Sequence, residues 1–150
     1  MTAPRLYLDA NVFIAAYESA TARSDHAWWT LDAIESGEFV GVTSELTLAE
    51  ILVKPLADGD DDLVRRYKDI ITSSDELIVV AVDRDILVDA AELRSQRTSL
   101  RLPDAIHVAS ARRAGCTHIV SDDRRLPFAP GIAVVRLGPH TIGIVRGQSP

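Results

Sequence analysis

The chain has 150 residues, 47% of them hydrophobic, and a formal net charge of −6 at pH 7. It is long enough to form one domain with a full core over residues 1–150 and too short for two domains. No apolar run approaches the roughly 18 residues of a membrane span, the N-terminus has no signal-peptide pattern, and the single cysteine, Cys116, cannot form an internal disulfide. These features predict a cytoplasmic protein.

Apolar spacing and turn residues predict strands that alternate with helices along the chain. We expect strands at residues 5–9, 39–43, 77–82, 117–121 and 133–137, the third of them covered on both faces because its apolar run is unbroken. We expect helices at residues 12–17, 26–36, 45–53, 60–72 and 103–114, and another that begins after residue 83. Strands that alternate with helices pair in parallel through crossovers, so the predicted fold class is an α/β sandwich. The tail, about 138–150, is predicted to be an edge strand or frayed.

Polar side chains precede most of the predicted helices and can serve as N-caps. Asn11, Ser44 and Asp83 each stand before a helix, and Ser24 or Asp25 stands before the second one. In the helix after Asp83, four apolar residues are expected to point inward. They are Ile86, Leu87, Ala90 and Leu93.

Four carboxylates lie inside or beside apolar sequence, where a lone charge is costly to desolvate. They are Asp9, Glu50, Asp104 and Asp123. A shared cation would offset that cost, and clustered oxygens are the ligands that Mg²⁺ prefers, so the pattern points to a magnesium site and to phosphate chemistry. Each acid also has a structural alternative: a helix cap for Asp9, a helix-dipole contact for Asp104, a turn for Asp123 and a solvated helix position for Glu50.

The predicted positions of these acids converge on one edge of the sheet. Ligands of parallel α/β sheets gather at the carboxyl ends of the strands. Asp9 ends the first strand, and Asp122 and Asp123 follow the fourth. Ser44 follows the second strand, and Glu50, six residues further along, would reach the site from the side.

Four sequence motifs resemble those of the PIN-domain family, most closely the VapC-type toxin ribonucleases of type II toxin–antitoxin systems. The motifs are LDANVF at residues 8–13, TSELTLAEIL at 43–52, LPDAIHVASA at 102–111 and IVSDDRRL at 119–126. The resemblance implies a three-layer α/β/α sandwich with a small, mainly parallel sheet, and a metal-dependent endonuclease that acts on RNA. It also implies a cognate antitoxin that blocks the site, and a homodimer.

Carried over by position, the resemblance implies that the four acids named above form the catalytic and metal-binding quartet. Asn11 and Ser44 match polar positions beside it. Where the family often has asparagine before the last acid, this chain has Asp122. This fifth candidate ligand leaves open which of Asp122 and Asp123 faces the metal.

The expected chemistry is hydrolysis of an RNA phosphodiester by metal-activated water. One or two Mg²⁺ ions would serve, with Mn²⁺ able to substitute. We expect Asp9 and Asp104 to be the principal ligands, with Glu50 and Asp123 completing the site directly or through water. Ser44 would bind a metal water or a substrate phosphate.

Nitrogen-bearing side chains near the acids are weaker candidates. Arg101, Arg124 and Arg125 flank the acids and are candidate phosphate contacts or solvated surface residues. His107 lies three residues after Asp104 and shares its helix face. We interpret His107 as a residue that supports the site or packs beside it, rather than as a general base.

Two other functions fit the same sequence. Another magnesium-dependent α/β phosphohydrolase, such as an aspartyl-phosphate phosphatase, would carry a second acid two residues after its nucleophile, where this chain has Asn11. A non-catalytic PIN-like domain would bind RNA or protein without turnover. The net charge of −6 argues against a nucleic-acid partner, but removing the five acids of the proposed site leaves only −1, and bound cations would reverse the local sign.

Overall fold

The computed structural model describes residues 2–123, 126 and 129–148. Within these residues, five strands form one parallel sheet: β1 (Arg5–Leu8), β2 (Val40–Ser44), β3 (Leu77–Val80), β4 (His118–Val120) and β5 (Ala133–Val135). The strand order is β3-β2-β1-β4-β5, so β1 lies at the centre. This arrangement confirms the predicted α/β sandwich with a parallel sheet.

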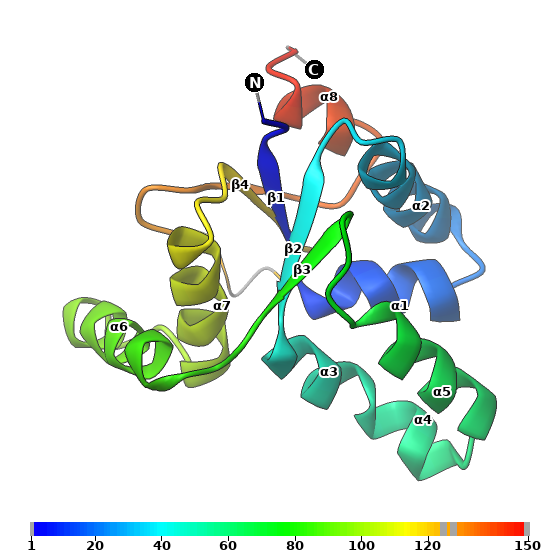
Figure 1. The fold of residues 1–150 in the computed structure, drawn as a ribbon, viewed down its shortest axis with the longest axis horizontal. Coiled ribbons are helices and arrows are strands. Elements are labelled where there is room, and N and C mark those ends of the chain that lie inside the picture. The colour runs from blue at the N-terminus through cyan, green and yellow to red at the C-terminus, as the bar shows by residue number, and fades with distance from the viewer. Residues whose placement is uncertain (1, 124–125, 127–128, 149–150) are drawn as a thin grey trace.

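Helices cover both faces of the sheet and produce the three layers visible in Figure 1. One face carries α6 (Arg84–Gln96) and α7 (Leu102–Arg113), and the other carries α1 (Ala10–Glu18), α2 (Ala22–Glu35) and α8 (Thr141–Val145). The segment between β2 and β3 forms α3 (Glu45–Ile51), α4 (Val53–Asp58) and α5 (Asp61–Ile70). Across the described residues, we find no helix with the length and apolar character that a membrane crossing requires.

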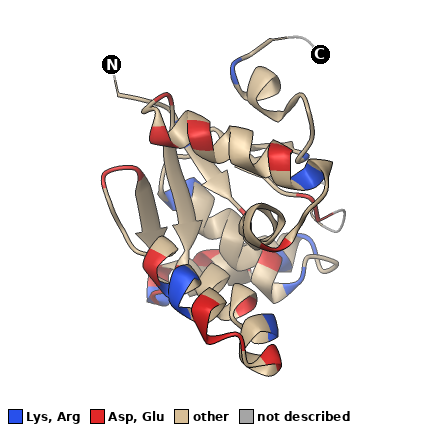
Figure 2. Cartoon of the chain, turned by 90° about the vertical axis from the view of Figure 1, so that its right-hand side faces the viewer, with Lys and Arg blue, Asp and Glu red and all other residues tan. Residues whose placement is uncertain are grey.

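The residues of β1 alternate between the two cores. Leu6 and Leu8 pack with α1 and α2 in one buried cluster, whereas Tyr7 packs with α6 and α7 in the other. This period of two is the normal geometry of a strand. Figure 2 shows that charged residues lie on the helices and loops, and within the five strands only Arg5 is charged. The Tyr7 side chain is fully buried between the sheet and the helices α6 and α7.

Two of the predicted N-caps are confirmed and two are wrong. The Ser44 side chain accepts a hydrogen bond from Leu46 N, and the Asp83 side chain accepts one from Ile86 N. Asn11, however, lies inside α1, because Asp9 caps this helix directly after the strand. The second helix starts earlier than predicted because Thr21, rather than Ser24 or Asp25, is its cap.

Three other details of the predicted helices and tail differ in the structure. The predicted helix at 45–53 breaks at Leu52, where α3 ends and α4 begins. In α6, Leu87 is 46% exposed rather than inward-facing, whereas the other three apolar residues of the predicted face are buried. Within the described part of the tail, residues 138–148, the chain forms the short helix α8 rather than a strand, and Val145 of this helix is buried in the same cluster as α1 and α2.

The strand β3 lies at the edge of the sheet and packs on both faces, as predicted, although its residues are only half-buried. Val79 packs against one buried cluster, and Ile78 and Val80 pack against the other. Its backbone is partly bonded by the loop that precedes it. The Ser74 side chain accepts a hydrogen bond from Leu77 N, and the Ser73 side chain accepts one from Val79 N. The Leu77 carbonyl accepts another from Ser74 N. The loop therefore provides hydrogen-bond partners for two N–H groups and one carbonyl of this edge strand.

Candidate metal centre

The candidate site lies at the topological switch point of the sheet, where the strand order reverses. From the central strand β1, the chain builds β2 and β3 on one side and β4 and β5 on the other. In open α/β sheets, the carboxyl ends of the two strands at such a switch point frame the ligand crevice. Asp9 follows β1 at this point, and its backbone N–H donates to the carbonyl of Val120 at the end of β4, 3.1 Å away.

Asp9 is buried and both of its carboxylate oxygens are hydrogen bonded. Oδ1 accepts a bond of 2.7 Å from the backbone N–H of Ala10, and Oδ2 accepts one of 2.6 Å from the Ser121 hydroxyl. The same side chain therefore starts α1 and reaches across to the segment after β4. The alternative reading of Asp9 as a helix cap is confirmed, and it coexists with a position inside the candidate site.

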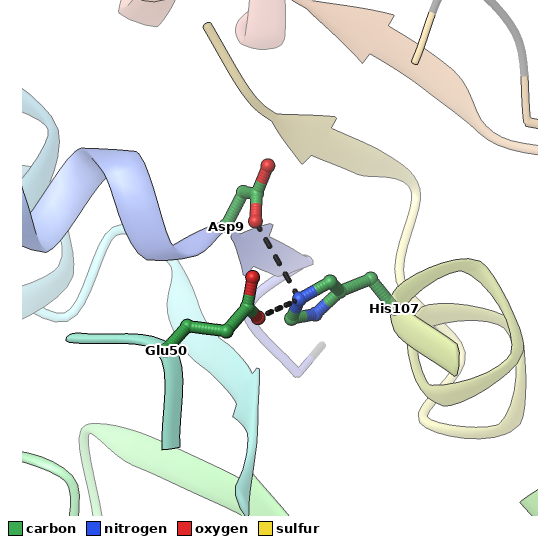
Figure 3. Close-up of side chains that lie close together, drawn as sticks. All are labelled: Asp9, Glu50 and His107. Carbon is green, nitrogen blue, oxygen red and sulfur yellow. Dashed lines mark hydrogen bonds and ion pairs between the residues drawn. The ribbon is translucent and has the colours of Figure 1, made fainter. Parts of the chain in front are cut away.

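Three side chains from separate elements point toward one another in Figure 3. Asp9 comes from the junction of β1 and α1, Glu50 from α3, and His107 from α7. The His107 Nε2 atom lies 2.5 Å from Glu50 Oε1 and 3.7 Å from Asp9 Oδ1. One ligand atom from each residue lies within 4.8 Å of the others. Carboxylate oxygens and an imidazole nitrogen at this spacing can hold a divalent cation.

The His107 ring is held from behind by Tyr7. The hydroxyl of the fully buried Tyr7 lies 2.6 Å from His107 Nδ1, and the two rings meet edge to face. Burial, followed by the nearby charge of Asp9, raises the pKa of Tyr7, so the phenol stays protonated. Burial lowers the pKa of His107, but the Glu50 hydrogen bond and the charges of Asp9, Glu50 and Asp104 outweigh it and raise the pKa overall. The imidazole is thus fixed between a phenol and a carboxylate.

Asp104 is buried in the first turn of α7 and is paired with an arginine. Arg101 Nε lies 3.2 Å from Asp104 Oδ2, and an Nη2 atom of the same guanidinium lies 3.5 Å from Asp123 Oδ2. Arg101 therefore bridges two of the four predicted ligands. Asp104 raises the pKa of His107 through its charge but does not belong to the group formed by Asp9, Glu50 and His107.

The neighbouring acids Asp122 and Asp123 diverge. The Asp122 carboxylate pairs with Arg23 of α2 at 2.5 Å, and its backbone N–H donates to Asn11 Oδ1. The Asp123 backbone N–H donates to the Ser121 hydroxyl, and its carboxylate faces Arg101. Of the two acids, Asp123 thus shares its ion pair with Asp104, whereas Asp122 is held by α2.

The remaining predicted residues have structural partners or lie outside the described part. Ser44 is fully buried and its hydroxyl accepts from Leu46 N; it also hydrogen bonds with Tyr7, which lowers the pKa of that phenol slightly against the effect of burial. Arg124 and Arg125 lie outside the described residues, so their predicted phosphate contacts stay predictions.

Sequence reasoning placed His107 beside the site but missed its place among the candidate ligand atoms, and it missed Tyr7 entirely. His107 stands between apolar residues on the helix that carries Asp104, which was the available signal. Tyr7 gave none, because it lies 100 residues from its partner and reads as an ordinary strand residue.

A model of the PIN domain matches residues 6–130 of the chain. The chain belongs to the PIN domain family. The matched region contains the three residues that cluster at the switch point, Asp9, Glu50 and His107. The comparison with curated proteins gave no match.

Solved structures with the same fold include toxin–antitoxin proteins. The VapBC2 structure from Rickettsia felis, bound to promoter DNA, has 14% identity and a TM-score of 0.70, covering 89% of this chain and 99% of that one. A toxin–antitoxin complex from Klebsiella pneumoniae has 21% identity, a TM-score of 0.65 and coverages of 87% and 95%. VapC20 of Mycobacterium tuberculosis, a Sarcin-Ricin loop cleaving toxin, has 20% identity, a TM-score of 0.62 and coverages of 76% and 86%. These likenesses establish the PIN fold of the chain.

Proposed function

We propose that this PIN domain protein is a metal-dependent endoribonuclease and the toxin component of a toxin–antitoxin pair. The proposal is carried by one observation: Asp9, Glu50 and His107 bring ligand atoms within 4.8 Å of one another at the carboxyl ends of the strands. Membership of the PIN family supports a nuclease over the other phosphohydrolases considered. Residues 1–150 form one such domain, which works in the cytoplasm as a homodimer.

The catalytic residues in this proposal are Asp9, Glu50, Asp104 and Asp123. A bound Mg²⁺ or Mn²⁺ ion would supply the Lewis acid that activates water and offsets phosphate charge. Asp9 is fixed by its two hydrogen bonds, and Glu50 is oriented by His107. These two acids are therefore held in place before a cation binds, which lowers the entropic cost of binding it.

The relatives support the choice of substrate and partner. VapC20 cleaves the Sarcin-Ricin loop, and the other two similar structures are a VapBC assembly and a toxin–antitoxin complex. For this chain we accordingly propose an RNA substrate and a cognate antitoxin protein.

The test is an RNA cleavage assay with purified full-length protein. Transfer and ribosomal RNAs are incubated with Mg²⁺ or Mn²⁺, and in parallel with EDTA. We expect metal-dependent cleavage that Glu50→Gln abolishes. The matched control is Glu38→Gln, because Glu38 pairs with Arg146 on the surface, away from the site. RNA binding without cleavage under both metals would replace the proposal with the non-catalytic alternative, and hydrolysis of a small phosphomonoester instead of RNA would favour a phosphatase.

A further inference from the structure

The positively charged side chain of Arg101 lies among acids that are expected to bind a metal ion. Its guanidinium lies between Asp104 and Asp123, which are 19 residues apart in sequence and both belong to the proposed acidic quartet. The Asp104 side chain is only 8% exposed, whereas the Arg101 side chain is 46% exposed. The acidic end of the ion pair is therefore fixed in the protein interior, and the arginine end is exposed to solvent.

This pairing has a clear role when no metal is bound. A buried carboxylate without a partner is costly, and two carboxylates facing one another repel. Arg101 offsets the charge of both. Arg101 is the N-cap residue of α7, but its side chain makes no capping hydrogen bond there. The guanidinium can therefore move away from the two acids without loss of a helix cap.

A divalent cation that binds the same carboxylates changes this balance. It offsets the charge of Asp104 and Asp123 more strongly than a guanidinium does, and it repels the positive charge of Arg101 at short range. The metal and the arginine therefore compete for these two acids.

On the basis of the proposed function, we infer that Arg101 is a built-in competitor of the metal ion, and that metal binding releases its guanidinium to bind a phosphate of the RNA. Arg101 thereby couples the two events. Without metal, the guanidinium of Arg101 pairs with Asp104 and Asp123. With metal bound, it is released toward solvent, where a phosphate can contact it. A guanidinium is suited to this second role because its planar fork matches phosphate oxygens.

The experiment compares Mn²⁺ affinity in the full-length wild type and in Arg101→Met, which keeps the unbranched apolar stem of the side chain but removes the charged guanidinium. Free Mn²⁺ is measured by electron paramagnetic resonance, independently of any cleavage. We expect the Mn²⁺ Kd of Arg101→Met to be about threefold to tenfold lower than that of the wild type, the size expected when one partly exposed competing charge is removed. Arg101→Lys, which keeps the charge but lacks the planar fork that contacts both acids, is expected to lie between the two.

The matched control is Arg113→Met. Arg113 is similarly exposed at 49% and pairs with Asp89, but it lies about 18 Å along α7 from residue 101, so its loss should leave the Mn²⁺ Kd unchanged. At saturating Mn²⁺, Arg101→Met should raise the KM for RNA about tenfold while kcat changes less, because a charge-assisted contact to substrate is lost; Arg113→Met should change neither.

The outcomes separate the inference from the proposed function. If the folded Arg101→Met and Arg101→Lys variants bind Mn²⁺ no more tightly than the wild type, Arg101 positions the acids rather than competing with the metal, and the inference is wrong. An unchanged KM would also overturn it, since the released guanidinium would then not reach the substrate. If the wild type itself binds no Mn²⁺, the metal-dependent function fails first and the inference with it.

Discussion

The Nε2 atom of His107 lies 2.5 Å from Oε1 of Glu50, a residue 57 positions earlier in the chain. This contact joins α7 to α3 across the carboxyl end of the sheet, and Tyr7 holds the other side of the same ring. The position of Glu50 in the site therefore depends on a phenol in the buried layer below.

Tyr7→Phe should destabilise the protein by about 1 kcal/mol, since it removes a hydrogen bond from a buried imidazole without creating a large cavity. The measurement is urea unfolding followed by circular dichroism. In a His107→Ala background, the same change should cost less, because the partner is already gone, and the difference gives the coupling energy. Equal midpoints for wild type and Tyr7→Phe would show that the contact does not contribute.

Asp9→Asn should preserve the fold and abolish metal binding. Asparagine still caps α1, whereas Asp9→Ala loses the cap and should cost about 1 kcal/mol for that reason. In thermal melts, Mn²⁺ should raise the Tm of the wild type and EDTA should reverse the rise, since a ligand that binds only the native state stabilises it. The Tm of Asp9→Asn should not respond to Mn²⁺. A full response in this variant would remove Asp9 from the ligand set.

Asp122→Asn should leave the Mn²⁺ Kd within about twofold of the wild type, because its carboxylate is held by Arg23 rather than by the site, and a partly exposed ion pair contributes little. Glu50→Gln should weaken Mn²⁺ binding by at least about tenfold, as expected for the loss of a charged ligand. Titration of both variants with Mn²⁺ tests the assignment. If the two variants lose affinity equally, Asp122 must turn toward the metal.

Cys116 should be unreactive in the folded protein. Burial raises the pKa of its thiol to about 12, although the nearby charge of Arg5 lowers it slightly. Below that pH the group stays a thiol, and the thiolate is the reactive form. We expect no reaction with a disulfide reagent at pH 8 under native conditions, one reactive thiol in urea, and a rate in the folded state that rises with pH. Rapid native reaction at pH 8 would place Cys116 on an accessible surface.

Local sequence signals predicted most of the fold. All five strands were located, since each is a short apolar run between turn residues, and the acid after β1 was correctly placed at the carboxyl end. The order of the strands was beyond such reasoning, so the edge position of β3 was missed. The helix α8 was missed because its five residues include Gly143, a poor helix former, and it is stabilised by packing of Val145.

The sequence was enough to predict which acids belong to the candidate site, but not which residues they pair with. Asp9, Asp104 and Glu50 could be found because charges beside apolar residues require an explanation. The ion pair between Arg23 and Asp122 joins residues that are distant in sequence, and surface arginines are too frequent for such a pair to be inferred. The same limit applied to Tyr7 and His107.

The serine hydroxyls that bond the backbone of β3 have a consequence for assembly. An exposed edge strand has unpaired backbone groups, to which a strand of another polypeptide can add. Here two N–H groups of the edge strand, at Leu77 and Val79, already have partners. A strand that adds at β3 would therefore have to displace these serine hydroxyls first, which disfavours extension of the sheet on this side.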